Sequence, residues 1–145
     1  MYSIIACIIR ESDQGKEISV RDVSNRRNSG SHPFIKNYKS DSGFPDFIIL
    51  ERKKDSNVRI LGCIEAKMPS VFLNLDNDQI KDHLNYFNKV IYTNGIEWMY
   101  FENKDKVFDV SLGEMIDKNS LKIKWGQEKT WNNLLKRIDE IEWTK

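Results

Sequence analysis

The chain of 145 residues has only two cysteines, a net charge of +1 and no long apolar run. Cys7 and Cys63 lie in apolar runs without a partner at metal-ligand spacing, which predicts small buried side chains in a reducing compartment. The apolar run from Ile4 to Ile9 is too short to span a bilayer and lacks the flanks of a signal peptide. We therefore expect a cytoplasmic protein.

The near-neutral charge gives no general electrostatic argument for a nucleic-acid partner, although local basic groups such as Arg52-Lys53-Lys54 are present. Internal repeats, low-complexity segments and a glycine-rich phosphate loop are also missing from the sequence. Hydrophobic residues make up 39% and charged residues 31%, as in globular proteins. A chain of this length can bury its own core, so we predict one domain over residues 1–145.

Two strand-like runs, Phe44–Glu51 and Arg59–Lys67, flank the polar residues 53–57. The runs are rich in β-branched and aromatic residues, and the polar residues between them are typical of a turn, so the segment predicts a β-hairpin. The segments Phe47–Leu50 and Leu61–Ile64 are apolar throughout, which indicates strands buried on both faces.

Charged side chains occur at one end of this hairpin. Glu65 and Lys67 are two residues apart and share a face, and pairing of the strands brings Asp46 near Glu65. Two carboxylates suit Mg²⁺, and a lysine beside the metal can orient a water and offset charge on a phosphorane. The alternative is a turn acid and two solvent-facing residues at a strand end. Three residues are expected to face the opposite layer: Ile60, Ile64 and Ala66.

Two helical segments are predicted before the hairpin, and a third helix directly follows it. Ile4–Ile9 favours helix weakly, and Glu17–Arg27 continues helical structure until Asn28–Ser31 breaks it. A third helix begins around Asp76 and runs to about residue 89. Its core stripe comprises Ile80, Leu84, Phe87 and Ile91, and its adjacent polar edge comprises Gln79, His83 and Tyr86.

The C-terminal half predicts further strands and a helix. Val90–Thr93 and Ile96–Glu102 flank Asn94-Gly95, a strong hairpin signal, and Val107–Leu112 adds another strand. Apolar residues at helical spacing over Thr130–Trp143 predict an amphipathic helix packed on the sheet.

The order of Pro45-Asp46, Glu65-Ala66-Lys67, a helix opening at Gln79 and a strand ending in Thr93-Asn94-Gly95 resembles the PD-(D/E)xK nuclease superfamily. The closest likeness is to the nuclease domain of type I restriction enzyme motor subunits and their stand-alone relatives. The match covers roughly residues 43–102. The resemblance implies an α/β, restriction-endonuclease-like core, in which helices flank a central mixed β-sheet.

The resemblance also implies the site. Asp46, Glu65 and the carbonyl of Ala66 would hold Mg²⁺, for which Mn²⁺ would substitute. Lys67 would position the attacking water, and Gln79 would order the metal shell or the substrate.

Two features depart from the family pattern. The tyrosine expected one turn after the glutamine is His83, so either Tyr86 stands in for it or His83 contacts phosphate or the site itself. The alternative is that His83 is an ordinary surface residue. Relatives often carry an acid from an N-terminal helix, and the candidates here are Glu17 and then Glu11.

The leading hypothesis is a Mg²⁺-dependent endonuclease that hydrolyses phosphodiester bonds in DNA, in a restriction, defence or mobile-element context. A chain this short would draw its specificity from a larger protein partner, from a homodimer or from DNA structure. The alternative from another class is a nuclease-fold protein that binds nucleic acid or inhibits a partner without catalysis. An RNA-directed nuclease also stays open.

Overall fold

The computed structural model describes residues 1–24, 39–54 and 57–145. Six strands form one sheet in chain order, and every neighbouring pair is antiparallel except β3 and β4, which are parallel. The helix α2 (Asp78–Tyr86) makes the crossover between these two strands. The strands of the sheet are β1 (Ile18–Asp22), β2 (Phe47–Glu51), β3 (Ile60–Ala66), β4 (Lys89–Thr93), β5 (Glu97–Glu102) and β6 (Asp105–Ser111).

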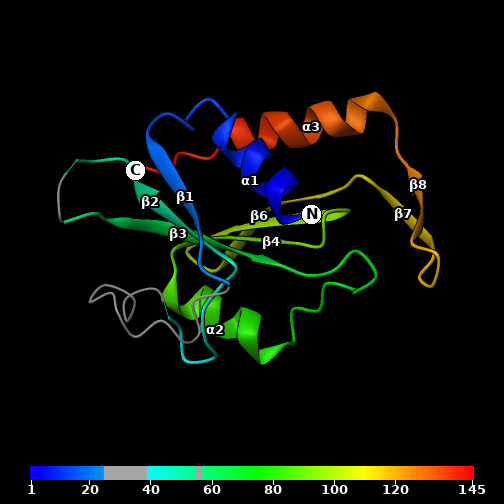
Figure 1. Ribbon diagram of the computed structural model, residues 1–145, viewed down its shortest axis with the longest axis horizontal. Coiled ribbons are helices and arrows are strands. Elements are labelled where there is room, and N and C mark those ends of the chain that lie inside the picture. The colour runs from blue at the N-terminus through cyan, green and yellow to red at the C-terminus, as the bar shows by residue number, and fades with distance from the viewer. Residues whose placement is uncertain (25–38, 55–56) are drawn as a thin grey trace.

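Helices cover both faces of this sheet. Figure 1 shows α1 (Tyr2–Arg10) and α3 (Glu128–Asp139) above it and α2 below it. Buried residues of α1 and α3 form one core with the sheet, and Ile80 of α2 belongs to a second core on the other face. The predicted fold class, a central mixed sheet flanked by helices, is therefore confirmed.

The hairpin of β2 and β3 is confirmed, with Phe47 opposite Ile64. Asp55 and Ser56 of the predicted turn lie outside the described residues. A bulge shifts the register between Ile49 and Leu50, so Ile60 packs with the α2-side core while Ile64 packs with the other. The expectation that Ile60 shares a layer with Ile64 was wrong because the bulge breaks the alternation.

Two expectations about the N-terminal part were wrong. The helix predicted over residues 17–27 is a strand from Ile18 to Asp22, because Ile18 and Val20 alternate into the core and pair with the edge of β2. Residues 25–31, including the predicted helix end, lie outside the described part of the chain. Cys7 is exposed on α1, whereas Cys63 is buried as expected. The helix expected over Ile4–Ile9 is confirmed as α1.

The helix α2 is shorter than predicted. Its cap is Asn77, whose side chain accepts from the Gln79 amide, and it ends at Tyr86 rather than near residue 89. Phe87 is extended, and Lys89 already begins β4. Ile91 therefore lies on β4 in the core under α1 and α3, not on the stripe of α2.

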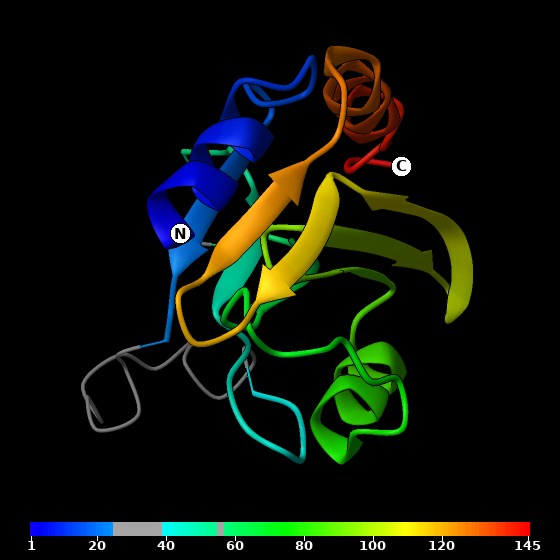
Figure 2. The same ribbon diagram turned by 90° about the vertical axis from the view of Figure 1, so that its right-hand side faces the viewer.

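The turn at Asn94-Gly95 is confirmed, and Gly95 has the positive φ of 86° that favours glycine. The strand expected over Val107–Leu112 is confirmed as β6. The hairpin of β7 (Gly113–Asp117) and β8 (Lys122–Trp125), drawn in gold to orange in Figure 2, was not predicted. The C-terminal helix is confirmed but ends at Asp139.

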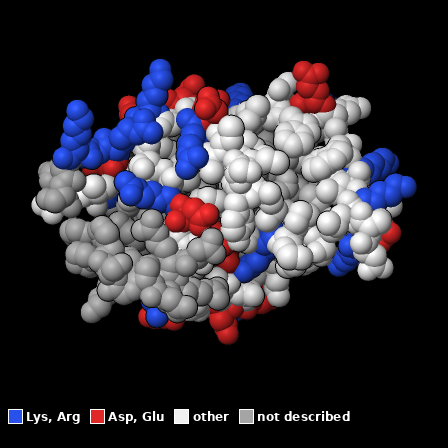
Figure 3. Space-filling model, in the orientation of Figure 1, with Lys and Arg blue, Asp and Glu red and all other residues white. Residues whose placement is uncertain are grey.

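Basic side chains gather at one end of the molecule. Figure 3 shows Lys and Arg at the upper left, over the tips of the first strands, beside a broad uncharged surface. Arg52, Lys53 and Lys54 directly follow β2 and are exposed. Among the described residues, no helix has the length and apolar character needed to cross a membrane.

Candidate active site

The first acid of the predicted site, Asp46, stands immediately before β2 and is held at both carboxylate oxygens. Its Oδ2 accepts from the backbone amide of Ala66 at 2.7 Å, so the register of the hairpin fixes its place beside β3. Its Oδ1 accepts from the hydroxyl of Tyr2 at 2.7 Å. Asp46 is thus anchored by the sheet on one side and by α1 on the other.

The second acid, Glu65, lies on the face of β3 that is covered by α2. Its side chain is only 4% exposed, and its Oε1 accepts from Nζ of Lys67 at 2.6 Å. The same Nζ donates to Oε1 of Gln79 at 2.7 Å, in the first turn of α2. The predicted alternation of β3 therefore brings Glu65 and Lys67 together, and the crossover helix adds Gln79.

The remaining oxygen of Glu65 faces His83, which is buried in the second turn of α2. Nε2 of His83 lies 3.3 Å from Oε2 of Glu65, and Nδ1 lies 2.9 Å from the hydroxyl of Ser40. The ring is fully buried, so the structure does not place it on a polar edge. The geometry matches direct contact of His83 with the site, through Glu65. It does not match a surface residue or contact with a phosphate on the solvent side, because the ring is buried.

The two acids and the lysine shape the ionisation of the site. Burial raises the pKa of Asp46 above its usual value of 3.8, the hydrogen bond from Tyr2 lowers it, and the charge of Glu65 raises it further. Burial and the hydrogen bond to Asp46 also raise the pKa of Tyr2 above 10.0, so its hydroxyl stays a donor. The carboxylates thus carry a repulsion that a bound cation would relieve.

Three candidates from the sequence lie away from this cluster. Glu17 is exposed and precedes Ile18, which pairs with Glu51 at the opposite end of β2 from Asp46, about 16 Å along the strand. Tyr86 lies in the last turn of α2 and lines a hollow beside Ile60–Gly62, at the start of β3. Glu11, the second candidate for an N-terminal acid, caps the far end of α1 from Tyr2 and is exposed.

Two residues at the site were missed by sequence reasoning. Tyr2 comes before the apolar run that signalled α1, and no local pattern links it to Asp46, 44 residues away. Ser40 lies in a loop segment and forms a two-residue bridge with Gly43 just before Pro45-Asp46. Both contacts depend on tertiary packing, which residue spacing does not reveal.

The residues present fit a hard cation. Within the described segments, no three His, Cys, Asp or Glu side chains converge on a metal position. Mg²⁺ commonly takes one or two carboxylates and completes its shell with waters and substrate phosphate. Asp46 and Glu65 supply that number, and Oε2 of Glu65 is buried without a hydrogen bond of good geometry.

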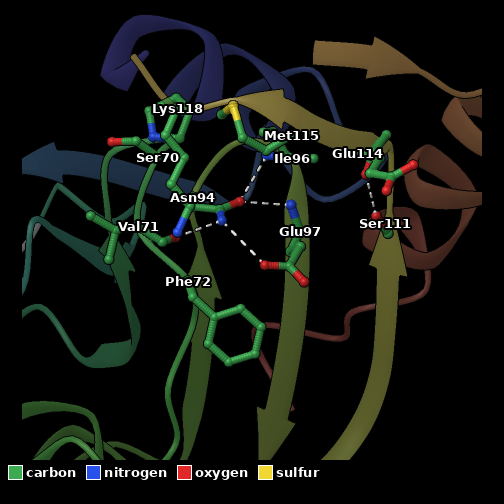
Figure 4. Close-up of a pocket in the computed structure, with 12 residues that line it drawn as sticks. Ser70, Val71, Phe72, Asn94, Ile96, Glu97, Ser111, Glu114, Met115 and Lys118 are labelled. Atoms are coloured by element: carbon green, nitrogen blue, oxygen red, sulfur yellow. Dashed lines mark hydrogen bonds between the residues drawn. The ribbon is translucent and has the colours of Figure 1, made fainter. Parts of the chain in front are cut away.

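The segment from Lys67 to α2 is tied to the turn after β4. Asn94 donates from Nδ2 to the carbonyl of Val71 at 2.9 Å and to Oε2 of Glu97 at 3.2 Å, as the dashed lines in Figure 4 show. Its Oδ1 accepts the amides of Ile96 and Glu97. A hollow of about 410 Å³ lies here, lined by Asn94, Glu97 and the exposed Phe72. The Asn94 turn thereby holds one end of the segment that follows Lys67.

Comparisons with known proteins support the fold. No family model and no curated protein matches the sequence. A chain from the cryo-EM structure of the DrdV–DNA complex is similar in structure, with a TM-score of 0.51 and 17% sequence identity. The similarity covers 97% of this chain but only 11% of that much longer chain. At this identity the likeness shows a shared fold, and the chemistry must be argued from the residues.

Proposed function

We propose that this chain is a Mg²⁺-dependent endonuclease domain that hydrolyses phosphodiester bonds in DNA. The proposal rests on one observation, the convergence on Lys67. Its Nζ contacts Oε1 of Glu65 and Oε1 of Gln79, and Asp46 is bound to the amide of the adjoining Ala66. An ordinary surface salt bridge joins two exposed side chains. Lys67 instead contacts a buried acid and the first turn of a helix, and a second acid lies at the same end of the strand.

Each residue has a distinct task in this reaction. Asp46, Glu65 and the Ala66 carbonyl would hold Mg²⁺, which supplies Lewis-acid polarisation of the scissile phosphate. Lys67 orients the attacking water and balances the charge that develops on the phosphorane. Gln79 holds the lysine in place through its amide oxygen.

In the proposed reaction the water oxygen bonds to phosphorus in line with the leaving 3′ oxygen. The P–O3′ bond breaks, the attacking water loses a proton to solvent, and the leaving 3′ oxygen takes one from solvent, so the products carry a 5′-phosphate and a 3′-hydroxyl. Lys67 keeps one of its three donors available for this water, because Glu65 and Gln79 occupy the other two.

DNA is the preferred substrate because the structural neighbour comes from a DNA complex. The exposed basic residues after β2 begin at Arg52, roughly 20 Å along the chain from Asp46, a distance over which a nucleic-acid backbone can extend. The chain spans a small share of that neighbour, so a larger partner or a homodimer is proposed as the source of specificity.

The test is a cleavage assay on supercoiled, linear and single-stranded DNA and on RNA, each with Mg²⁺, Mn²⁺ or EDTA. Wild-type protein is compared with Asp46→Ala and with Asp41→Ala, an exposed acid in the same segment as control. We expect metal-dependent DNA cleavage that Asp46→Ala abolishes and Asp41→Ala retains. Cleavage that survives Asp46→Ala would overturn the assignment, and preferential cleavage of RNA would change the substrate.

A nuclease-fold module without catalysis predicts a different result. Such a protein would bind DNA equally with and without Mg²⁺ and would cleave none of the substrates. Retained binding by Asp46→Ala together with absent cleavage by the wild type would favour that alternative over the nuclease.

A further inference from the structure

The segment that follows Lys67 carries a run of exposed apolar side chains. Residues 68–75 contain no charged residue, and four of their apolar side chains are exposed: Met68, Val71, Phe72 and Leu75. The ring of Phe72 is 73% exposed, more than any other large hydrophobic side chain that the structure describes. Single apolar residues on a surface need no explanation, but four within eight residues form a patch that indicates a contact surface.

Both ends of this segment lie at the proposed site. The segment begins directly after Lys67 and leads to Gln79, whose Oε1 accepts from Nζ of Lys67 at 2.7 Å. The chain between these two residues therefore forms a loop that starts and ends at the lysine. A DNA strand held at Lys67 lies within reach of this loop.

Two contacts tie the loop to strand β4 and the turn after it. The carbonyl of Val71 accepts from Nδ2 of Asn94 at 2.9 Å. The backbone of Asn74 is hydrogen-bonded to Tyr92, and burial raises the pKa of Tyr92 while the charge of Lys67 and this hydrogen bond lower it. Tyr92 is therefore close to the lysine and to the loop at the same time.

The burial of Leu73 leaves its neighbour Phe72 on the outside. Leu73 packs in the core on the α2 side of the sheet, and Phe72 is exposed beside it. Figure 4 shows the ring of Phe72 pointing away from Asn94. A hollow of about 410 Å³ lies next to the ring, so a planar group can reach it without any change in the core.

The backbone of Phe72 lies a few nucleotides from the lysine. Five residues of extended chain span at most about 18 Å. The amide of Val71 donates to the carbonyl of Met68, so a turn shortens that distance. One strand of DNA advances by about 3.4 Å per nucleotide, which places Phe72 no more than about five nucleotides from Lys67.

We propose that Phe72 stacks on an unpaired base of the DNA strand that is cut at Lys67. The site would then prefer DNA with an unpaired base near the scissile phosphate, since a base inside the duplex must first leave its stack. The place of the cut rests on the proposed function, whereas stacking on the base requires no cleavage.

A base suits this loop better than a phosphate does. Phosphates bind to lysine and arginine side chains, and residues 68–75 have neither. An aromatic ring stacks on any of the four bases, and its replacement by alanine typically weakens binding by about 5- to 150-fold. Phe72 would therefore be a substrate-binding residue that selects for an unpaired base and not for a sequence.

The test measures DNA binding by fluorescence anisotropy at one fixed salt concentration, with Ca²⁺ in place of Mg²⁺ and again in EDTA. The probes are a duplex with one bulged base and the same duplex with an abasic nucleotide at the bulge. The proteins are the wild type, Phe72→Ala, Phe72→Leu and Phe72→Trp. Leu135→Ala is the control, because this apolar side chain is exposed on α3, which lies across the sheet from α2.

We expect the wild type to bind the bulged base about 5- to 150-fold more tightly than the abasic bulge. Phe72→Ala and Phe72→Leu should bind both probes equally, while Phe72→Trp and Leu135→Ala should keep the preference. Removing the ring and removing the base delete the same contact, so the two losses should not add. Additive losses, or a preference that persists in Phe72→Ala, would overturn the proposal.

The outcomes also separate this proposal from the proposed function. A wild type that prefers the bulged base but cleaves no DNA in Mg²⁺ would contradict the nuclease and support the stacking. Cleavage by the wild type, together with unchanged DNA binding in Phe72→Ala, would overturn the stacking alone. Unchanged DNA binding with loss of an oligomer in Phe72→Ala, measured by light scattering, would assign the loop to a protein interface and overturn it as well.

Discussion

Replacing Asp46 by asparagine separates a ligand role from a structural one. The asparagine Oδ1 can accept from the amide of Ala66, as the carboxylate does now. Its Nδ2 then meets the hydroxyl of Tyr2, which can turn from donor to acceptor. Both hydrogen bonds can therefore still form, while the negative charge is removed.

The effect on stability follows from these two hydrogen bonds. A bond to a charged group contributes about 2 kcal/mol and a neutral one about 1 kcal/mol, so the exchange costs roughly 2 kcal/mol at most. Against this loss, the variant no longer desolvates a carboxylate or places it beside Glu65, the two effects that raise the pKa of Asp46. We expect the unfolding free energy at pH 7 without metal to change by less than about 1 kcal/mol.

Cleavage should respond quite differently. A metal ligand supports roughly 3 to 5 kcal/mol of transition-state stabilisation, which corresponds to a loss of about 10²- to 10⁴-fold in rate. Urea unfolding in EDTA and nicking of supercoiled DNA in Mg²⁺ measure the two quantities on one preparation. Destabilisation by more than about 3 kcal/mol, with nicking reduced only in proportion to the unfolded fraction, would show Asp46 to be structural.

The raised pKa of Asp46 determines how the free energy of unfolding changes with pH. Because the folded pKa of Asp46 is raised above 3.8, protonated Asp46 favours the folded state. This contribution is complete below pH 3.8 and is lost as pH rises through the raised folded pKa. The stability of Asp46→Asn relative to the wild type should therefore improve over that interval. A constant difference between the two unfolding curves from pH 3 to pH 7 would contradict the pKa direction.

Three further predictions follow from other contacts. Lys67→Met leaves the buried carboxylate of Glu65 without its cation and should lower the unfolding free energy by about 2 to 4 kcal/mol, measured by urea unfolding. Adding Glu65→Gln to this variant should restore most of the lost stability. Tyr2→Phe removes the hydrogen bond that lowers the pKa of Asp46, so Mn²⁺ binding followed by titration calorimetry should require a higher pH, and an unchanged pH profile would refute the contact. Gly62→Ala would push a Cβ into a backbone carbonyl of β4 and should lower the unfolding free energy by about 1 to 3 kcal/mol, whereas an unchanged melting temperature would contradict this packing.

The central part of the fold was predictable because its signals are local. Alternation and turn residues located the β2–β3 hairpin, and Asn94-Gly95 located the next one. The failures occurred where tertiary contacts decide the structure. Residues 18–22 form a strand because β2 offers an edge for pairing, and this pairing overrides a weak helical stripe.

In the candidate site, too, local sequence signals were predictive and contacts between distant segments were not. Spacing within one strand placed Glu65 beside Lys67, pairing of the hairpin strands brought Asp46 near them, and the resemblance to a nuclease family suggested Gln79. Contacts from distant segments, such as Tyr2 on Asp46, have no counterpart in a single sequence. The burial of His83 was also missed, because a histidine next to an apolar stripe has the same spacing whether it faces solvent or a buried acid.

We propose that Lys67 and the acids around it form a metal-dependent site for DNA cleavage. The most direct measurement is the single-turnover rate of nicking of supercoiled DNA in Mg²⁺ by the wild type, Lys67→Ala and Lys81→Ala, whose lysine is half exposed on α2. We expect cleavage by the wild type and Lys81→Ala, a rate at least about 100-fold lower in Lys67→Ala, and no cleavage in EDTA. Equal rates for Lys67→Ala and the wild type would contradict it.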